Sequence, residues 1–190
     1  MYNLVVFLSG NGSTLQSIID AINNGKLNAR INLVISNNPN AYGLQRARIE
    51  NIDTYIIQSS ETEDIDEELI DILDEYDVDL IVLAGYLKKI GTHLLNMYTI
   101  INTHPSLLPK FGGKGMYGMK VHTAVVEAKE EYTGPTIHFV NDKYDEGNII
   151  RQTKIPVLLT DSPEDVSRKV QEVEKIQLIE VLNDFVNGNI

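Results

Sequence analysis

The stretch YNLVVFLSGNGSTLQSIIDAI, residues 2–22, indicates the fold class of this 190-residue chain. It begins with an apolar, β-rich run at residues 2–8 and continues through the polar segment Ser9-Gly10-Asn11-Gly12-Ser13. Apolar residues then recur at the spacing of one helix face, namely Leu15, Ile18, Ile19 and Ile22. The stretch therefore predicts a strand, a tight turn at glycine and a helix, in that order.

The same alternation of strand and helix continues through the first half of the chain. Apolar, strand-like runs occupy residues 31–35, 54–57 and 80–84, and amphipathic helical segments occupy residues 41–50 and 61–79. Strands that are apolar along their whole length are typical of parallel sheets covered by helices on both faces. We therefore expect a doubly wound, Rossmann-like α/β fold with a mostly parallel sheet.

The second half of the chain follows a different pattern. A short helix near residues 94–97 and a strand at 99–102 lead into a long irregular stretch at residues 103–121. Loops of this length inside a compact domain usually carry function. The later patterns predict a helix at 122–129, an antiparallel strand pair at 136–140 and 149–157, and a last helix from Ser162 to about Asn187. We expect residues 1–190 to form a single domain.

Charge is distributed unevenly along the chain. The net charge of −11 comes entirely from residues 61–79, which contain 11 acidic residues and no basic one. This segment is expected to be a helix with a solvated outer face, its apolar face consisting of Ile65, Leu69, Ile72 and Leu73. The next 47 residues, 80–126, contain five lysines and three histidines but no carboxylate. We therefore expect this second segment to provide a local field that attracts anions.

Composition excludes several classes of protein. The absence of cysteine removes disulfides, thiolate nucleophiles, cysteine-ligated zinc and iron–sulfur clusters. The apolar runs have the length of strands rather than of membrane spans, and the N-terminus has neither the basic nor the apolar segment of a targeting peptide. An acidic chain is also a poor general binder of nucleic acid. We therefore expect a cytoplasmic protein with small-molecule partners and no nucleic-acid or membrane partner.

The glycine loop at residues 10–13 is a candidate anion site. It lies where a strand passes into a helix, so that free backbone N–H groups and the helix dipole favour a phosphate. The alternative is a tight turn that needs glycine only for its dihedral angles. The loop is not a dinucleotide fingerprint, because Leu15 stands where the third glycine would be, and it lacks the Gly-Lys-Ser/Thr of a P-loop.

Asn102 and His104 form a second candidate site at the end of a predicted strand. Strand alternation directs both side chains to the same face, where they present an amide donor and a titratable imidazole. His104 could instead be a hydrogen-bonded structural residue, and Asp145, in the predicted hairpin loop, could simply cap its own turn. A metal site made by His104, His122 and His138 is a further alternative, but their spacing is unlike that of zinc motifs, and we expect no metal.

Five blocks of sequence, in order and spacing, resemble the phosphoribosylglycinamide formyltransferase (glycinamide ribonucleotide transformylase) family of folate-dependent formyltransferases. They are Ser9-Gly10-Asn11-Gly12-Ser13, Ser36-Asn37, Leu83-Ala84-Gly85-Tyr86, the block from Asn102 through His104-Pro105-Ser106-Leu107-Leu108-Pro109 to Lys110, and His138-Phe139-Val140 followed by Asp145-x-Gly147. The resemblance covers nearly the whole chain. It implies an enzyme with a single formyltransferase domain that uses 10-formyltetrahydrofolate to formylate the amine of 5'-phosphoribosylglycinamide in de novo purine biosynthesis.

The resemblance also implies roles for individual residues. Asn102, His104 and Asp145 match the family's catalytic positions: Asn102 would donate to the oxyanion, His104 would shuttle a proton, and Asp145 would raise the pKa of His104 or orient a water. The nucleotide would be held by Gly10, Asn11, Gly12, Ser13, Thr14 and Glu174. The folate would be held by Leu87, Lys88, Lys89, Ile90, Asn102, Val140, Asn141, Asp142, Lys143, Tyr144 and Asp145. No metal is implied, and the protein would be a monomer or a weak homodimer.

The chain departs from the family pattern at three places. Thr14 stands where the family commonly has asparagine, and residues 61–79 lack a basic residue that faces the folate glutamate in some members, which leaves Lys88 or Lys89 for that role. The loop at residues 111–121 is longer than in the shortest relatives, and its lysines could close over an anionic ligand. Methionyl-tRNA formyltransferase, formyltetrahydrofolate deformylase and a binding module without turnover are the competing interpretations. An intact Asn102, His104 and Asp145 argues against the last.

Overall fold

The computed structural model describes residues 1–60 and 62–190, so Glu61, the first residue of the predicted acidic stretch, lies outside the described residues. The chain divides into two compact units, which are described separately. Unit 1 comprises residues 1–101 and 183–190, and unit 2 comprises residues 102–182. The single domain expected from the sequence stays a prediction.

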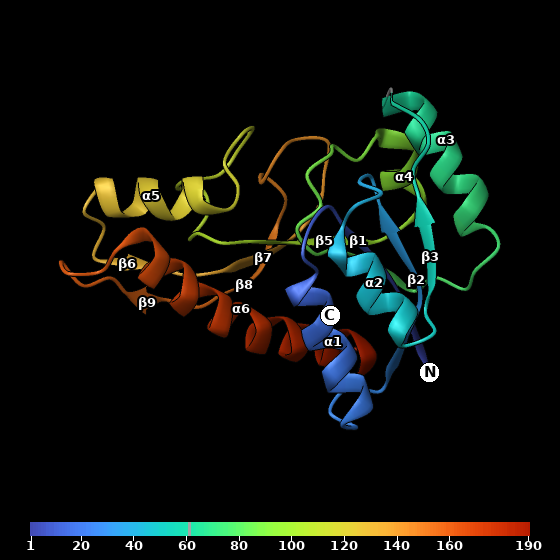
Figure 1. The fold of residues 1–190 in the computed structure, drawn as a ribbon, viewed down its shortest axis with the longest axis horizontal. Helices are drawn as coiled ribbons and strands as arrows, with labels where there is room; N and C mark the ends of the chain where they lie inside the picture. Colours follow the sequence, from blue (N-terminus) through green and yellow to red (C-terminus); the bar gives the residue numbers. More distant parts are fainter. Residues whose placement is uncertain (61) are drawn as a thin grey trace. The chain divides into compact units, whose positions relative to one another are not determined.

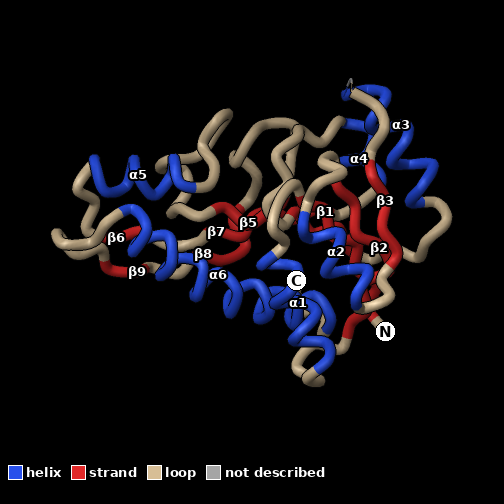
Figure 2. Tube along the Cα trace, in the orientation of Figure 1, coloured by secondary structure: helices blue, strands red, loops and turns tan. Residues whose placement is uncertain are grey.

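The chain forms a seven-stranded sheet of order β3-β2-β1-β4-β5-β7-β8 and a separate pair, β6-β9 (Figures 1 and 2). The elements of unit 1 are β1 (Tyr2–Leu8), α1 (Ser13–Asn23), β2 (Ala29–Ser36), α2 (Tyr42–Ile49), β3 (Asp53–Ile56), α3 (Thr62–Leu73), β4 (Leu80–Leu83) and α4 (Thr92–Met97). Strand β5 (Ile100–His104) leads from unit 1 into unit 2. Unit 2 continues with α5 (Met119–Glu127), β6 (Tyr132–Thr133), β7 (Thr136–Phe139), β8 (Ile149–Gln152), β9 (Ile155–Pro156) and most of α6 (Pro163–Val186).

The parallel part of the sheet confirms the predicted α/β class. Strand β1 pairs in parallel with β2 and with β4, and β2 pairs in parallel with β3. Residues 4–8 of β1 and 80–82 of β4 have no exposed surface, because each strand is covered on both faces. Each such aliphatic or aromatic side chain contributes about 1.5–3 kcal/mol on burial. The continuous apolar runs of the sequence are therefore the core of unit 1.

The predicted acidic helix is confirmed over α3, Thr62–Leu73, but it ends before Asp79, its predicted apolar residue Ile72 is only half-buried, and one acidic residue is not solvated. The other predicted apolar residues, Ile65, Leu69 and Leu73, are buried. Asp66, however, is only 3% exposed, and its carboxylate accepts hydrogen bonds from the backbone N–H groups of Gly91, His93 and Leu94 at 3.0, 3.1 and 3.3 Å. This carboxylate satisfies the otherwise unpaired donors at the start of α4.

Unit 2 confirms the predicted hairpin but shortens its second strand. Strands β7 and β8 are antiparallel, as expected. The single strand predicted at 149–157 is wrong: it breaks after Gln152, and β9 pairs with β6, a strand that the sequence patterns did not predict. Pro135, which precedes β7, accepts a hydrogen bond from the Thr153 N–H at 3.3 Å but has no N–H to donate in return, so the ladder continues no further.

Two helix boundaries of unit 2 also bear on the predictions. Helix α5 begins at Met119, three residues before the predicted start at His122, so that the irregular loop spans residues 105–118 (tan in Figure 2). Helix α6 begins as predicted: the Asp165 N–H donates to Ser162 Oγ, and the Ser162 N–H donates to Asp165 Oδ2, both at 3.1 Å. In the described part of the chain, no helix has both the length and the apolar character needed to cross a membrane.

Candidate active site

The glycine loop in unit 1 has the geometry expected of an anion site. Gly12, the residue before α1, has φ 74°, and no side chain caps this helix N-terminus. A Cβ on Gly12 would lie 2.6 Å from Cα of Gly43 on α2, and the Gly43 N–H donates to Gly10 O at 3.1 Å. Only glycine therefore fits at position 12, because both its dihedral angle and the approach of α2 exclude a side chain.

Arg46 on α2 contacts this loop, and no sequence pattern predicted this contact. Its Nε and NH2 atoms donate to the backbone O and the side-chain Oδ1 of Asn11 at 2.9 and 3.0 Å, and NH1 donates to Gln16 Oε1 at 3.0 Å. The guanidinium also lies 4.9 Å from the ring centroid of Tyr42. Because the N–H donors of a guanidinium have a fixed planar geometry, these hydrogen bonds hold the backbone of the glycine loop in one position.

Ser9 connects the carboxyl ends of three parallel strands in unit 1. Its N–H donates to Gly85 O at 3.0 Å, its Oγ donates to Asn37 Oδ1 at 2.5 Å, and Oγ accepts from the Leu87 N–H at 2.9 Å. Ser9, Asn37 and Leu87 follow β1, β2 and β4. The carboxyl ends of such strands are where open α/β sheets bind ligands, and this connection fixes the backbone that precedes the predicted folate segment.

The remaining predicted binding residues lie in separate segments. In unit 1, Leu87, Lys88 and Lys89 are exposed after β4, whereas Ile90 is buried. In unit 2, Glu174 is half-buried on α6. The loop after β7 leaves Asp142, Lys143 and Tyr144 exposed and Val140 and Asn141 half-buried, with the Lys143 N–H donating to Asn141 Oδ1 at 3.0 Å.

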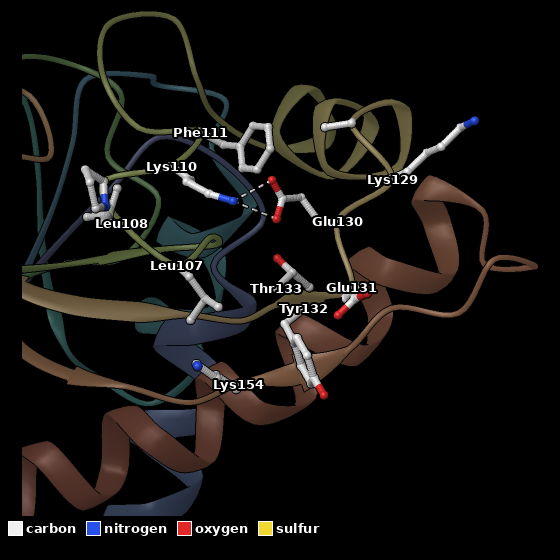
Figure 3. Close-up of a pocket in the computed structure, with 12 residues that line it drawn as sticks. Leu107, Leu108, Lys110, Phe111, Lys129, Glu130, Glu131, Tyr132, Thr133 and Lys154 are labelled. Atoms are coloured by element: carbon white, nitrogen blue, oxygen red, sulfur yellow. Dashed lines mark hydrogen bonds and ion pairs between the residues drawn. The ribbon is translucent and has the colours of Figure 1, made fainter.

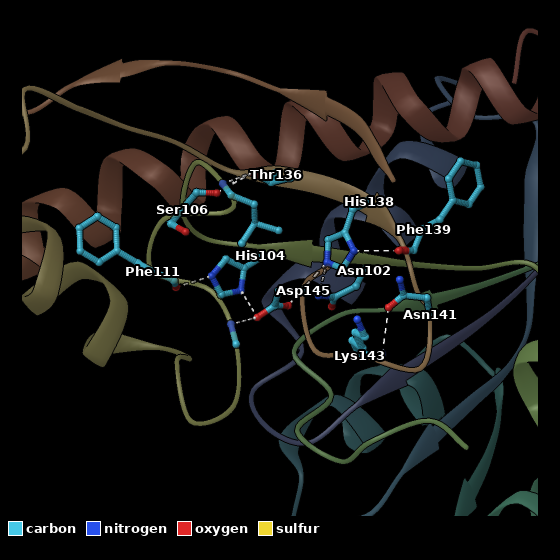
Figure 4. A network of polar contacts seen from close by, with 12 residues as sticks. Asn102, His104, Ser106, Phe111, Thr136, His138, Phe139, Asn141, Lys143 and Asp145 are labelled. Atoms are coloured by element: carbon cyan, nitrogen blue, oxygen red, sulfur yellow. Dashed lines mark hydrogen bonds and ion pairs between the residues drawn. The ribbon is translucent and has the colours of Figure 1, made fainter. Parts of the chain in front are cut away.

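Unit 2 brings together the three residues predicted to be catalytic (Figure 4). His104, 4% exposed at the end of β5, has its Nδ1 3.4 Å from Oδ2 of Asp145. The Gly113 N–H donates to the same oxygen at 2.8 Å. Oδ1 of Asp145 lies 3.6 Å from Nε2 of His138, which in turn lies 3.1 Å from Nδ2 of Asn102. The carboxylate thus lies between two imidazoles, one of which contacts the amide.

Backbone conformation directs this contact set. Asp145 has φ 59° and Phe111 has φ 56°, both in the left-handed region that non-glycine residues rarely adopt. The Phe111 carbonyl accepts a hydrogen bond from His104 Nε2 at 2.9 Å. A Cβ on Gly112 would lie 2.5 Å from Leu108 Cδ2 and 3.2 Å from Asp145 Cβ. A side chain at residue 112 would therefore require Leu108 to shift and Asp145 to move slightly away from the loop after β5.

Burial sets the protonation state of His104, and the neighbouring polar groups set that of Asp145. Burial lowers the pKa of His104, and this effect outweighs the opposing influence of Asp145 and of the Phe111 carbonyl. The expected influence of Asp145 is present, because its charge raises the pKa of His104, but burial has the larger effect and leaves that pKa below its usual value. Burial would raise the pKa of Asp145, but His138, His104 and the Gly113 N–H together hold it below its usual value. The site thus pairs an uncharged imidazole with an ionised carboxylate at neutral pH.

The two other histidines of the metal alternative occupy different environments. His138 contacts Asp145 and Asn102, a placement that strand alternation alone did not predict. His122 is buried on α5, its Nδ1 has no hydrogen-bond partner, and burial followed by repulsion from His104 lowers its pKa to about 4. Within residues 1–60 and 62–190, no three His, Cys, Asp or Glu side chains are arranged to hold a metal ion.

A cavity of about 550 Å³ lies elsewhere in unit 2 (Figure 3). It is lined by residues of the loop after β5 and of the segment around β6, and the Lys110 Nζ atom bonds both carboxylate oxygens of Glu130 at 2.8 and 2.9 Å. None of the residues predicted to bind substrate or to act in catalysis lines it. Phe111 lines this cavity and also accepts the hydrogen bond from His104 shown in Figure 4.

Comparison with known proteins identifies the family. The model of the formyl transferase family matches residues 2–182. A phosphoribosylglycinamide formyltransferase of Escherichia coli is 38% identical over 99% of this chain and 89% of its own length. A chloroplastic phosphoribosylglycinamide formyltransferase of Arabidopsis thaliana is 40% identical over 94% of this chain, which spans only 63% of that relative.

Solved structures agree with the sequence comparisons. Glycinamide ribonucleotide transformylase 1 from Symbiobacterium toebii superposes with a TM-score of 0.91 at 35% identity, covering 99% of this chain and 89% of that one. The phosphoribosylglycinamide formyltransferase of Coxiella burnetii, solved in complex with CHES, superposes with a TM-score of 0.91 at 39% identity. The match covers 98% of this chain and 88% of that one. The chain therefore belongs to the formyl transferase family, and within it to the phosphoribosylglycinamide formyltransferases.

Proposed function

We propose that this chain transfers the formyl group of 10-formyltetrahydrofolate to the amine of 5'-phosphoribosylglycinamide. The products are formylglycinamide ribonucleotide and tetrahydrofolate, a step of de novo purine biosynthesis. The observation that carries the proposal is the set of contacts among Asn102, His104 and Asp145, which combines an amide donor, a buried neutral imidazole and an ionised carboxylate. These are the three groups that acyl transfer between two nitrogens requires.

The amide of Asn102 stabilises the developing oxyanion. The substrate amine attacks the formyl carbon, a C–N bond forms, and the carbonyl oxygen becomes negatively charged. One Nδ2–H of Asn102 is directed at His138, which leaves the second for that oxygen. A donor of this kind contributes about 10²- to 10³-fold in rate.

His104 and Asp145 move the proton. The Nε2–H of His104 is donated to the Phe111 carbonyl, so the basic lone pair of the neutral ring is on Nδ1, beside Asp145 Oδ2. His104 Nδ1 takes the proton from the attacking amine, and the carboxylate stabilises the imidazolium. The proton then passes to N10 of the folate as the C–N10 bond breaks. General acid–base catalysis of this kind contributes about 10²- to 10⁴-fold.

Substrate contacts form the second part of the proposal. The loop at Gly10, Asn11, Gly12, Ser13 and Thr14 binds the nucleotide phosphate, supported by the uncapped start of α1 and by Arg46 beside the loop. Glu174 contacts the glycinamide end of that substrate. Residues 87–90 and 140–145 contact the folate, and Lys88 or Lys89 pairs with its glutamate tail. This tail contact is supported by the exposure of both lysines.

We also propose a cellular location and a set of partners for this protein. A cytoplasmic location is supported by the absence of cysteine, although the Arabidopsis relative is chloroplastic. The substrates are small molecules, and the net charge of −11 argues against a nucleic-acid partner. Sedimentation of the purified protein tests the expected monomer or weak homodimer.

One assay tests the activity against its alternatives. Purified protein is mixed with 10-formyltetrahydrofolate, and deformylated folate is measured with and without 5'-phosphoribosylglycinamide. Release that requires the nucleotide supports the proposal, release without it indicates a hydrolase, and binding without release indicates a binding module.

A matched pair of variants on one strand tests the residues. His104→Ala should lower kcat by at least about 10²-fold. Thr103→Val is the control, because Thr103 is the neighbouring residue on β5, directed to the opposite face, and its Oγ1 has no hydrogen-bond partner to lose. Turnover of His104→Ala within a few-fold of the unchanged protein would contradict the assigned role.

A further inference from the structure

His138 is a buried titratable residue to which the proposed reaction assigns no step. It is 2% exposed on β7. The pairing of β7 with β8 shifts register between Ile137 and His138, so that Ile137 pairs with Arg151 and His138 with Ile149. Such bulges often redirect a side chain beside a functional site. The irregularity coincides here with the residue whose ring lies beside Asp145 (Figure 4).

The hydrogen bond at one ring nitrogen fixes the tautomer of His138. Nδ1 lies 2.9 Å from the backbone oxygen of Phe139. A carbonyl oxygen only accepts, so Nδ1 carries a proton. The neutral ring then has its lone pair on Nε2, which is therefore an acceptor.

The tautomer of His138 in turn determines the orientation of the Asn102 side-chain amide. Its Nδ2 atom lies 3.1 Å from His138 Nε2. An amide nitrogen donates and does not accept, so one Nδ2–H is held by His138 and the amide cannot rotate by 180° without losing this bond. The second Nδ2–H and the Oδ1 atom of Asn102 consequently have a defined direction.

Two titratable groups face His138 besides this amide. Asp145 Oδ1 lies 3.6 Å from the same Nε2, and His104 is close enough that His138 contributes to the lowering of the His104 pKa. Nε2 cannot accept from Asn102 and donate to Asp145 at once. The contact within hydrogen-bond distance is the one to Asn102, so the His138 ring orients this amide.

We propose that His138 is a positioning residue for formyl transfer, whose Nδ1–H tautomer holds the Asn102 amide so that its second Nδ2–H meets the formyl oxygen. This inference rests on the proposed function, which supplies the formyl oxygen. His138 itself touches no reacting atom. Its effect on rate passes through Asn102.

Kinetic variants test this role. His138→Phe removes the acceptor, and kcat should fall about 10- to 100-fold while the KM of each substrate changes by less than about threefold. His138→Gln keeps an acceptor oxygen near the position of Nε2 and should restore most of the rate. Ile137→Val, the neighbouring buried residue of β7, is the control and should keep full kcat. A His138→Phe variant with kcat within threefold of the unchanged protein would overturn the proposal.

A double-variant cycle separates positioning from a general structural effect. In an Asn102→Ala background, His138→Phe should lower kcat by no more than about twofold further, because residues that act as a unit are not additive. The same loss in both backgrounds would mean that His138 acts independently of Asn102, and the proposal would be wrong.

A spectroscopic measurement needs no substrate. Long-range ¹H–¹⁵N correlation of the His138 ring at neutral pH should show a protonated Nδ1 and an unprotonated Nε2. A ring protonated on Nε2 alone overturns the positioning role whatever the activity, whereas a wild-type enzyme that transfers no formyl group contradicts only the proposed function. The two failures are therefore distinguishable.

Discussion

The imidazole of His104 and the carboxylate of Asp145 lie 3.4 Å apart, and the loop after β5 contacts both, through the Phe111 carbonyl on one and the Gly113 N–H on the other. Each group of the pair thus has a backbone partner as well as the other. The arrangement favours a charge-separated pair once His104 gains a proton, although burial keeps the free imidazole neutral. The value of kcat, the packing of the loop after β5 and the pH dependence of stability should therefore all depend on the contact between His104 and Asp145.

Asp145→Asn removes the charge that stabilises the imidazolium. Asparagine keeps an acceptor for the Gly113 N–H, so the loop should stay in place while kcat falls about 10²-fold with little change in either KM. Steady-state kinetics measure the split between kcat and KM. Glu146→Gln, an exposed carboxylate next in sequence, is the control and should leave kcat unchanged. Equal losses in the two variants would mean that net charge, and not this contact, matters.

Arg46→Lys should weaken the nucleotide site alone. Lysine cannot donate simultaneously to the backbone and side-chain oxygens of Asn11, so the loop loses its fixed path. We expect the KM of the nucleotide substrate to rise about tenfold, a loss of about 1.4 kcal/mol, with the folate KM unchanged. Arg48→Lys, exposed on the same helix, is the control. A rise in both KM values would point to general damage to unit 1.

Gly112→Ala should disturb the loop after β5. The added Cβ would meet Leu108 Cδ2 and Asp145 Cβ, and overpacking of this kind costs about 1–3 kcal/mol. Denaturant unfolding should show that loss together with reduced kcat, because the Gly113 N–H moves away from Asp145. Lys114→Ala, exposed in the same loop, should stay within about 0.5 kcal/mol of the unchanged protein. A stable and fully active Gly112→Ala protein would show that the loop need not pack there.

His122 should make stability depend on pH. Its pKa is lowered to about 4 in the folded protein and is near 6.5 when unfolded, so the unfolded chain binds the proton first as pH falls. The free energy of unfolding should therefore decrease between about pH 6.5 and pH 4, by on the order of 2–3 kcal/mol from this residue. His104, whose pKa is also lowered, adds to the same window.

His122→Leu separates the two histidines. Denaturant titrations at several pH values should show a shallower decrease for this variant, and the remaining slope is that of His104. Asp145 affects stability only at lower pH. Because its pKa is lowered in the folded protein, its contribution to the free energy of unfolding is lost only as pH falls below about 3.8. An unchanged slope in His122→Leu would exclude His122 as the source.

Lys88 and Lys89 should decide affinity for the folate tail. The double variant Lys88→Glu/Lys89→Glu should raise the KM of a polyglutamylated folate about tenfold or more, and added salt should reduce the difference. Glu67→Gln/Asp71→Asn neutralises two exposed acids of α3 and is the control, with little expected effect. Equal changes in the two double variants would mean that the uneven charge of the chain has no role in folate binding.

Local patterns were sufficient for most of the fold. The apolar run of residues 2–8, the glycines after it and the helical spacing that follows became β1, the loop and α1, because each depends on neighbours a few residues away. The prediction failed where a distant residue decided the outcome. The β7–β8 ladder ends beside Pro135, which has no N–H to donate, and Ile155–Pro156 pair with β6 instead.

Sequence patterns alone predicted the order of strands and helices and the position of the glycine loop, and the family resemblance pointed to Asn102, His104 and Asp145. The tertiary structure decided their environment: which nitrogen of His104 is free to take a proton, that its pKa is lowered, and that His138 lies against Asn102. The physical reason is the distance along the chain over which each kind of interaction acts. Strand and helix patterns follow from steric and apolar preferences along the chain, whereas burial and the direction of a hydrogen bond depend on groups that only folding brings together.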